Sequence, residues 1–361
     1  MLLGIPIVKA LLFDSTSFVA LDVLSTFGIV FLLFLAGLEI DIRLIKETAK
    51  TSILIGMAAT LTPLFLGVFV LLIIGYTLPV AIVFGIALSV TASGTIIGTL
   101  MELNAINTKL GAIFVAAGTV DDILEVTLLS VVTLLIQGGG YIQLALLPLQ
   151  LLVFVVISFV LFKFLTKLMV HVKAREEPDG HGVELFSVAI IILIGMAALS
   201  ESLSIGYLIG AVLAGFLLQN SMKKIGEKSR FQIVNTTRLI ALAFVVPFFF
   251  ANIGLNFNVS AILENPILTV IAVAIAIGGA IVGAFITKPF SRLSFRQLYV
   301  VGWAMSSKGG VELVVALLAQ RYGLFPPEIF NALVAMAIVT TLAFPFVLKR
   351  EIQRNRLLLS Q

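Results

Sequence analysis

Residues 85–100 read GIALSVTASGTIIGTL, and residues 298–315 read LYVVGWAMSSKGGVELVV. Each places a short run of small polar residues in the middle of an apolar stretch long enough to cross a bilayer. Backbone that leaves the helix inside hydrocarbon exposes unpaired N–H and C=O groups, so it is tolerated only where protein or a water-filled cavity covers it. Small residues also serve helix–helix packing. Because both runs lie at mid-depth, we expect two discontinuous helices.

The composition places the whole chain among membrane proteins. Of its 361 residues, 60% are apolar and only 12% charged, and its mean hydropathy is +1.18. Soluble domains average about 45–50% apolar and about 25% charged residues, which excludes an ordinary soluble enzyme and a nucleic-acid-binding chain. The absence of cysteine excludes disulfides, thiolate metal sites and thiol catalysis. We expect a single transmembrane domain over residues 1–361, without a soluble domain.

Eleven stretches are apolar and long enough, or nearly so, to span a bilayer, which takes roughly 20 residues per helix. They cover residues 18–38, 51–75, 79–101, 110–136, 142–170, 184–202, 204–219, 238–257, 262–287, 296–320 and 327–348. The seventh is short and rich in small residues, so we expect it to be tilted or half-buried. The sequence thus predicts an all-α polytopic membrane protein with about eleven transmembrane helices.

Lysine and arginine residues predict the orientation of these spans. Twenty of the 23 fall in alternate loops and in the C-terminal segment, on one side of the membrane. The opposite side has Lys9 and Arg321, and Lys308 lies inside a span. Because basic loops stay in the cytoplasm, we expect a multi-pass protein of the cell membrane with its N-terminus outside and its C-terminus cytoplasmic.

This orientation relates the two broken spans by inversion. Each is the middle member of three consecutive spans, over residues 51–136 and 262–348, and the two groups cross the membrane in opposite directions. Broken helices at matching places in inverted repeats are the best sequence indication of a transporter's binding site. We expect these groups to form the transport core, with the two broken helices crossing, and the remaining spans to form a scaffold or dimerisation region.

The span at 110–136 brings acidic residues to mid-membrane. Asp121 and Asp122 lie about twelve residues beyond Lys109, which is about 18 Å along a helix. A carboxylate at that depth costs several kcal/mol and is a candidate functional group, although a neutral, hydrogen-bonded carboxyl can also serve helix packing. Glu125 lies one turn beyond Asp121 and can share its face.

Two adjacent carboxylates in a low dielectric should not both be ionised unless a cation lies beside them. Asp121 and Asp122 can therefore hold either a monovalent cation or a proton, which is the competition that exchange requires. Thr91 and Ser93, at the first break, can add carbonyl and hydroxyl oxygens for the cation. The positive ends of the half-helices offset part of the buried negative charge.

Lys308 is the one basic residue inside a span, and Glu312 follows it by one helical turn. We interpret Lys308 as a charge that compensates the crossed helix ends, with Glu312 or an aspartate as its partner. The alternative is a lysine that extends its ammonium to the membrane surface, but the centre of the span is far for that.

These residues resemble motifs of the monovalent cation/proton antiporter superfamily, which includes bacterial sodium/proton exchangers and plant cation/proton exchangers. The likeness covers nearly the whole chain. It rests on TFGIVFLLFLAGLE at 26–39, Thr91 at the first break, Val120-Asp121-Asp122, PFFFANIGL at 247–255 and SKGGVEL at 307–313. The resemblance implies that Asp122, the second aspartate, is the essential ligand for cation and proton, and that the protein is a homodimer.

The chain departs from the family pattern in three places. Members usually have thirteen or so spans, and we expect this sequence to match from the third onward, without the first two spans, which usually help to form the dimer interface. Many members have a lysine in the antepenultimate span that pairs with the first aspartate, whereas the matching residue here is Ala280. We also expect no C-terminal nucleotide-binding domain, since the sequence ends soon after Arg356.

We therefore predict a secondary active transporter, not an enzyme, that exchanges Na+ or K+ for protons by alternating access. It needs no resident cofactor, and its expected partners are the bilayer, the cation, the proton and a second copy, with no nucleic acid. Two alternatives stay open: a monovalent cation channel on the same fold, and a non-antiporting relative such as an organic-anion symporter. The acidic pair disfavours an anion site.

Overall fold

The computed structural model describes residues 15–40, 49–103, 105–106, 108–138, 141–175, 183–203, 205–222, 227–264 and 266–354. All regular secondary structure in these residues is helical. Six helical segments among them are long and apolar enough to cross a membrane, and three further apolar helices are shorter. Each of the eleven predicted spans corresponds to one helix or to a consecutive set of helices, which confirms an all-α polytopic fold.

Contacts divide the chain into two compact units, one comprising residues 1–40 and 129–256 and the other residues 41–128 and 257–361. We call them the first and the second unit. The helices of the first unit are α2 (Ser15–Glu39), α8 (Tyr141–Arg175), α9 (Val183–Ser202), α10 (Tyr207–Met222), α11 (Glu227–Ile240), the π-helical η2 (Ala241–Val245) and α12 (Val246–Asn256). Within this unit α2 packs against α10 and α12, and α9 packs against α10.

The second unit contains both broken spans. Its helices are α4 (Ala49–Ile74), α5 (Leu78–Ser89), α6 (Ser93–Glu102), α13 (Val259–Glu264), α14 (Pro266–Ile286), the short 3-10 helix η3 (Lys288–Phe290), α15 (Phe295–Met305), α16 (Val311–Arg321) and α17 (Pro327–Arg354). Most of α7 (Lys109–Ile136) also belongs to it, because the division falls after residue 128. Within the unit α4 packs against α5 and α14, and α14 packs against α15 and α17.

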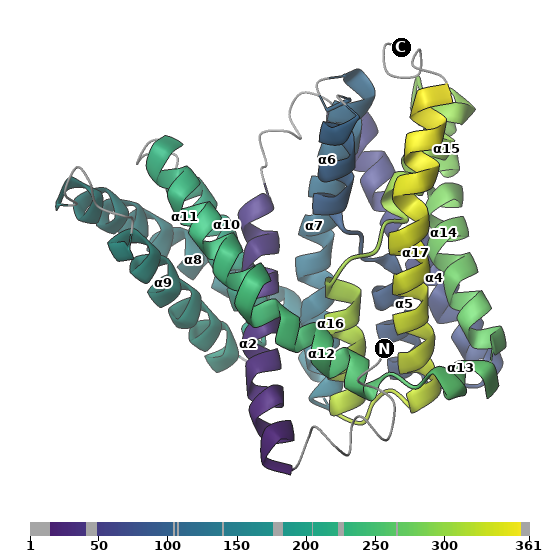
Figure 1. The fold of residues 1–361 in the computed structure, drawn as a ribbon, viewed down its shortest axis with the longest axis horizontal. Helices are drawn as coiled ribbons and strands as arrows, with labels where there is room; N and C mark the ends of the chain where they lie inside the picture. Colours follow the sequence, from purple (N-terminus) through teal and green to yellow (C-terminus); the bar gives the residue numbers. More distant parts are fainter. Residues whose placement is uncertain are drawn as a thin grey trace. The chain divides into compact units, whose positions relative to one another are not determined.

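Both expected breaks are present. In the first broken span, α5 ends at Ser89 and α6 begins at Ser93. In the second, α15 ends at Met305 and α16 begins at Val311. Figure 1 shows the non-helical segments that join α5 to α6 and α15 to α16 in the middle of the two spans. The prediction of two discontinuous helices in corresponding positions of two three-span groups is confirmed.

Two predicted spans have different bounds in the structure. The stretch predicted at 262–287 falls in two helices, α13 and α14, and residue 265 between them lies outside the described residues. Pro266 is the first residue of α14, a position that proline favours because its missing N–H would have no partner in the helix. The stretch predicted to begin at 238 belongs to a helical segment that starts at Glu227, since the polar residues of α11 continue the helix beyond its apolar part. Residues 176–182, which the sequence predicts to be a charged cytoplasmic linker between two spans, lie outside the described residues.

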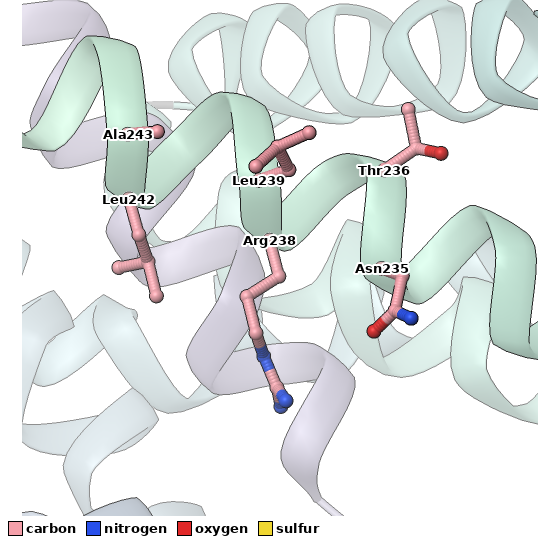
Figure 2. A pocket seen from close by; sticks show the side chains of 6 residues that line it. All are labelled: Asn235, Thr236, Arg238, Leu239, Leu242 and Ala243. Carbon is pink, nitrogen blue, oxygen red and sulfur yellow. The ribbon is translucent and has the colours of Figure 1, made fainter.

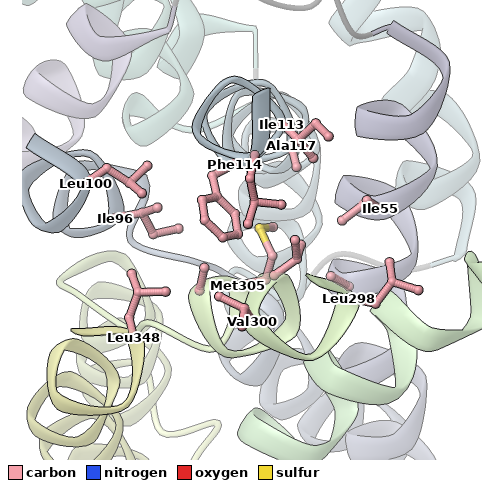
Figure 3. Packing of buried hydrophobic residues seen from close by; sticks show 14 of the residues in the cluster. Ile55, Ile96, Leu100, Ile113, Phe114, Ala117, Leu298, Val300, Met305 and Leu348 are labelled. Carbon is pink, nitrogen blue, oxygen red and sulfur yellow. The ribbon is translucent and has the colours of Figure 1, made fainter. Parts of the chain in front are cut away.

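An apolar cluster fixes the helices on one side of the breaks. Figure 3 shows Phe114 of α7 and Met305 of α15 within this cluster, together with Ile96 of α6, Ile55 of α4 and Leu348 of α17. All five side chains are at most 1% exposed. The cluster therefore holds α6 and α15, one half of each broken span, against the intact helices of the same unit.

Close backbone contact between α2 and α10 depends on two glycines. A Cβ on Gly37 would lie 1.9 Å from the carbonyl oxygen of Val212, and a Cβ on Gly215 would lie 2.1 Å from that of Phe34. Both contacts are to backbone, which cannot rotate away. Small residues at such interfaces let membrane helices approach closely.

We expect Gly37→Ala to lower the free energy of unfolding of the purified protein by about 1–3 kcal/mol, and so to lower its unfolding temperature. This is the usual effect of overpacking a filled interior. Gly195→Ala is the matched control, because a Cβ there meets no atom within 4 Å. The measurement is the unfolding temperature of both variants in the same detergent. A Gly37→Ala variant as stable as wild type would contradict this packing.

Candidate functional site

Asp121 is held rigidly where the first broken span meets α4 and α7. Its side chain is fully buried. Its Oδ2 accepts a hydrogen bond from the backbone N–H of Thr91 at 3.0 Å, and its Oδ1 accepts one from the hydroxyl of Thr60 on α4. Thr91 lies in the break itself, so Asp121 supplies one of the acceptors that the interrupted helix lacks.

Asp122 lies in a different environment, although it is the next residue. Its side chain is half-buried, and the hydroxyl of Ser93 is 3.0 Å from its Oδ1 and 3.2 Å from its Oδ2. Ser93 is the first residue of α6. The acidic pair thus has one carboxylate that is fixed inside the protein and another at the start of a half-helix, where the helix dipole favours negative charge.

The two breaks contact each other directly. The N–H of Ala92 donates to the carbonyl oxygen of Ser307 at 2.9 Å, and the hydroxyl of Thr91 donates to that of Met305 at 2.9 Å. The hydroxyls of Thr95 and Ser307 are 2.5 Å apart. Backbone groups that the helices leave unpaired therefore find partners in the opposite break, which confirms the expected crossing.

The buried ammonium of Lys308 joins the second break to the end of α5. Its Nζ donates to the carbonyl oxygen of Val90 at 2.6 Å and to that of Ser89 at 3.2 Å. These carbonyls are the negative end of a half-helix, which a cation stabilises. The side chain is fully buried, so it does not extend to a membrane surface. From the sequence we expected Lys308 to compensate the crossed helix ends, with Glu312 or an aspartate as its partner, and its ammonium does bond to the carbonyls at the end of α5.

Two glutamates complete the set of acidic residues that the sequence singled out. Glu125 is 6% exposed and lies one turn beyond Asp121 on α7. Glu312 is 1% exposed in the first turn of α16, and neither of its carboxylate oxygens has a hydrogen-bond partner among the residues that the structure describes. A buried ion without partners is strongly disfavoured. Glu312 lies in the first turn of α16, where the positive end of the helix dipole stabilises a negative charge.

The unit thus carries four carboxylates and one ammonium around the crossing, namely Asp121, Asp122, Glu125, Glu312 and Lys308. Removing a charge from water costs several kcal/mol, and adjacent like charges add to that cost. Full ionisation of this set is therefore unfavourable unless a cation is bound, and without a cation one or more of the carboxylates must bind a proton. No group of three or more His, Cys, Asp or Glu side chains in the described part of the chain has the geometry of a metal site.

Residues outside the predicted set also shape the site. Thr60 bonds to Asp121, and Thr341 of α17 donates its hydroxyl to the carbonyl oxygen of Lys308 at 2.8 Å. Neither threonine has a sequence signal, since each lies in an ordinary apolar span far along the chain from its partner. Ala280 of α14, the position at which the resemblance led us to expect a lysine, is fully buried in the apolar cluster.

Comparison with known proteins assigns the chain to a family. A family model described as the transmembrane part of sodium/hydrogen exchangers matches residues 1–350. The chain belongs to this sodium/hydrogen exchanger family. The membership confirms the resemblance to monovalent cation/proton antiporters that the motifs indicated, and it places the protein among membrane transporters.

Individual relatives of this exchanger agree with that assignment. It is 28% identical to an Na(+)/H(+) antiporter of Enterococcus hirae, over 90% of this chain and 83% of the relative. It is 29% identical to cation/H(+) antiporter 19 of Arabidopsis thaliana over 91% of its own length, but spans only 42% of that longer protein. The sodium proton antiporter MjNhaP1 of Methanocaldococcus jannaschii has a similar fold, with a TM-score of 0.63 and 17% identity over 98% of this chain and 89% of the other.

Proposed function

We propose that this exchanger moves a monovalent cation, Na+ or K+, in one direction and protons in the other through one site at Asp121 and Asp122. The observation that supports this most is the difference in burial and hydrogen bonding between the two aspartates. Asp121 is buried and bonded to Thr60 and Thr91, whereas Asp122 is half-buried beside Ser93. Asp122 is then the carboxylate that cation and proton can contest.

The surrounding groups have distinct roles in this proposal. The hydroxyl oxygens of Thr91 and Ser93 and the carbonyls at the break supply further ligands for a dehydrated cation. Lys308 holds the end of α5 in place and offsets negative charge. Glu125 and Glu312 stay protonated or share the charge of Lys308. The cation only binds and dissociates, and the proton forms and breaks the O–H bond of a carboxyl group, so the proposed cycle has no enzymatic step and no resident cofactor.

We further propose that the second unit carries the ion by alternating access while the first unit serves as a scaffold and dimer interface. The boundaries of the second unit, residues 41–128 and 257–361, support this because they enclose most of the core expected at 51–136 and 262–348. The distribution of basic residues supports a cytoplasmic C-terminus in the cell membrane.

The test is transport by the purified protein in liposomes that contain a pH-sensitive dye. An exchanger moves protons out of acid-loaded liposomes when Na+ or K+ is added, even when the membrane potential is clamped at zero. A channel instead lets the cation flow until its Nernst potential is reached and, with the potential clamped at zero, causes no proton movement when the cation is added. Running the assay with each cation separately identifies the transported ion.

Thr91→Ala is expected to raise the apparent KM for the cation more than it lowers the maximal rate. The change removes a hydroxyl oxygen at the break but no charge, and the backbone N–H that bonds to Asp121 remains. Thr91→Ser keeps the hydroxyl and is the matched control. If Thr91→Ala lowers only the maximal rate, the hydroxyl merely holds the breaks together and is not a cation ligand.

We expect one proton to be exchanged for one cation, without net charge movement. The resemblance implies that many members have a lysine that pairs with the first aspartate, whereas this chain has Ala280 there, and Lys308 donates its hydrogen bonds to the end of α5. Moving one charge across a membrane potential of 100 mV changes the free energy by about 2.3 kcal/mol, so the transport equilibrium of an electrogenic exchanger must depend on the potential. The measurement is the final pH gradient in liposomes whose potential is set with valinomycin, using Na+ as the exchanged ion. A gradient that shifts steeply with voltage would reject one-for-one exchange.

A further inference from the structure

A pocket lies along the last turns of α11 and the adjoining η2. Its lining residues are polar at one end and apolar at the other, as are the headgroup and acyl chain of a phospholipid. We propose that residues 235–243 bind one anionic glycerophospholipid, with its phosphate at Arg238 and the upper part of an acyl chain along Leu239 and Leu242. This site is in the first unit and is separate from the acidic pair, so it does not depend on the proposed exchange.

The order of the lining residues along the helix carries the proposal. The pocket has a volume of about 490 Å³ and is lined by Asn235, Thr236, Arg238, Leu239, Leu242 and Ala243. Figure 2 shows Asn235, Arg238 and Leu242 pointing to one side of the helix, and Thr236 and Leu239 to the other. Along the chain, the lining changes from polar to apolar between Arg238 and Leu239, near the end of α11. A lipid changes from headgroup to acyl chain in the same direction.

The guanidinium of Arg238 is available to a phosphate. Its side chain is 51% exposed, and it lies 3.6 Å from Oε1 of Glu39, which is too far for a hydrogen bond. Arg238 donates no hydrogen bond to any other described residue. Arginine offers planar paired donors that match phosphate oxygens, so an approaching phosphate can compete with this loose ion pair.

The apolar part of the pocket is uncovered. Leu239 is 67% exposed and Leu242 is 52% exposed. Leu242 and Ala243 lie in the π-helical turn η2, a type of helix irregularity that often occurs at functional sites. A free phosphate ion would leave both leucines uncovered, whereas the first carbons of an acyl chain would cover them.

The charge of the sequence that leads up to Arg238 favours an anionic lipid over a zwitterionic one. Residues 221–238 contain five basic residues and one acidic residue, the basic ones being Lys223, Lys224, Lys228, Arg230 and Arg238. They fall on the side of the membrane that the proposed orientation makes cytoplasmic. Basic groups there attract the anionic lipids of that leaflet, and each contributes about a fivefold gain in binding.

The test is the unfolding temperature of the purified, delipidated protein during titration with dioleoylphosphatidylglycerol. We expect this lipid to raise the temperature and dioleoylphosphatidylcholine to raise it much less. Arg238→Gln should weaken the apparent affinity for phosphatidylglycerol about fivefold. Glu39→Gln breaks the same ion pair but keeps the guanidinium, so it should bind the lipid at least as tightly as wild type.

Two controls distinguish this site from a general effect of surface charge and from a site for phosphate alone. Arg296→Gln removes another half-exposed arginine, which is paired with Glu351 at 3.3 Å, and should leave lipid affinity unchanged. Glycerol 3-phosphate, which has the phosphate without the chains, should not stabilise the protein. The proposal is overturned if Arg238→Gln binds phosphatidylglycerol like wild type, if Glu39→Gln or Arg296→Gln loses as much affinity as Arg238→Gln, or if glycerol 3-phosphate stabilises as well as the lipid.

Discussion

Replacing Asp122 by asparagine is expected to reduce exchange to the level of vesicles without the protein. Asparagine keeps the shape of the side chain and can still hydrogen-bond to the hydroxyl of Ser93, which lies 3.0 Å from Oδ1 in the wild type. It cannot carry a negative charge or take up a proton at neutral pH. The cation loses its charged ligand and the proton loses its acceptor, so both halves of the cycle fail while the fold survives. The measurement is proton movement in everted vesicles, together with the unfolding temperature of the variant.

Asp22→Asn is the matched control. Asp22 is also half-buried in a span, on α2 of the first unit, and its Oδ1 accepts a hydrogen bond from Asn252 at 3.2 Å. An asparagine carbonyl can accept the same bond, and no break lies nearby along α2. We expect transport to continue in this variant. A folded Asp122→Asn protein with full activity would contradict the assignment of the site.

Replacing Lys308 by methionine is expected to destabilise the protein by about 2–4 kcal/mol and to abolish most transport. Methionine has a similar length, so the change mainly removes the ammonium. The carbonyls of Ser89 and Val90 then lose their charged donor inside the protein. Hydrogen bonds to charged groups contribute about 1.5–3 kcal/mol each, and part of that is regained because no ammonium needs to be desolvated.

Lys288→Met tests whether any buried or half-buried lysine would give this result. The Nζ of Lys288 also donates to a backbone carbonyl, that of Leu293 at 2.6 Å, but at the end of α14 and away from the crossing. We expect a smaller loss of stability and preserved transport. Unfolding temperatures in detergent and initial exchange rates in liposomes measure both effects. Equal behaviour of the two variants would show that Lys308 has no particular role at the crossing.

The fold could be predicted largely because the membrane restricts the choices. Long apolar stretches in lipid must be helices, and the two runs of small polar residues could be recognised as breaks because each lies in the middle of such a stretch. The alternation of basic loops then related the two halves by inversion. The division between α13 and α14 was missed, since residues 262–287 are apolar throughout apart from the short polar run before Pro266.

The acidic part of the site could be predicted for a similar reason, whereas its hydrogen-bond partners could not. Asp121 and Asp122 stand out because charges are rare at mid-span. Thr60 and Thr341 do not, because a threonine can satisfy its hydroxyl within its own helix and is common in membrane spans. The partners of Lys308 depend on which helix end lies beside it, and that follows from the packing of two distant segments.

The central claim is that a cation and a proton contest one carboxylate, and the pH dependence of cation affinity tests it most directly. The apparent KM for the transported cation is measured in liposomes at a series of pH values with equal pH on both sides at the start. Competition by one proton predicts that, in the pH range where the carboxyl is mostly protonated, the KM rises about tenfold for each unit by which the pH falls. The maximal rate stays constant. A KM that does not change with pH, with only the maximal rate affected, would contradict a shared site.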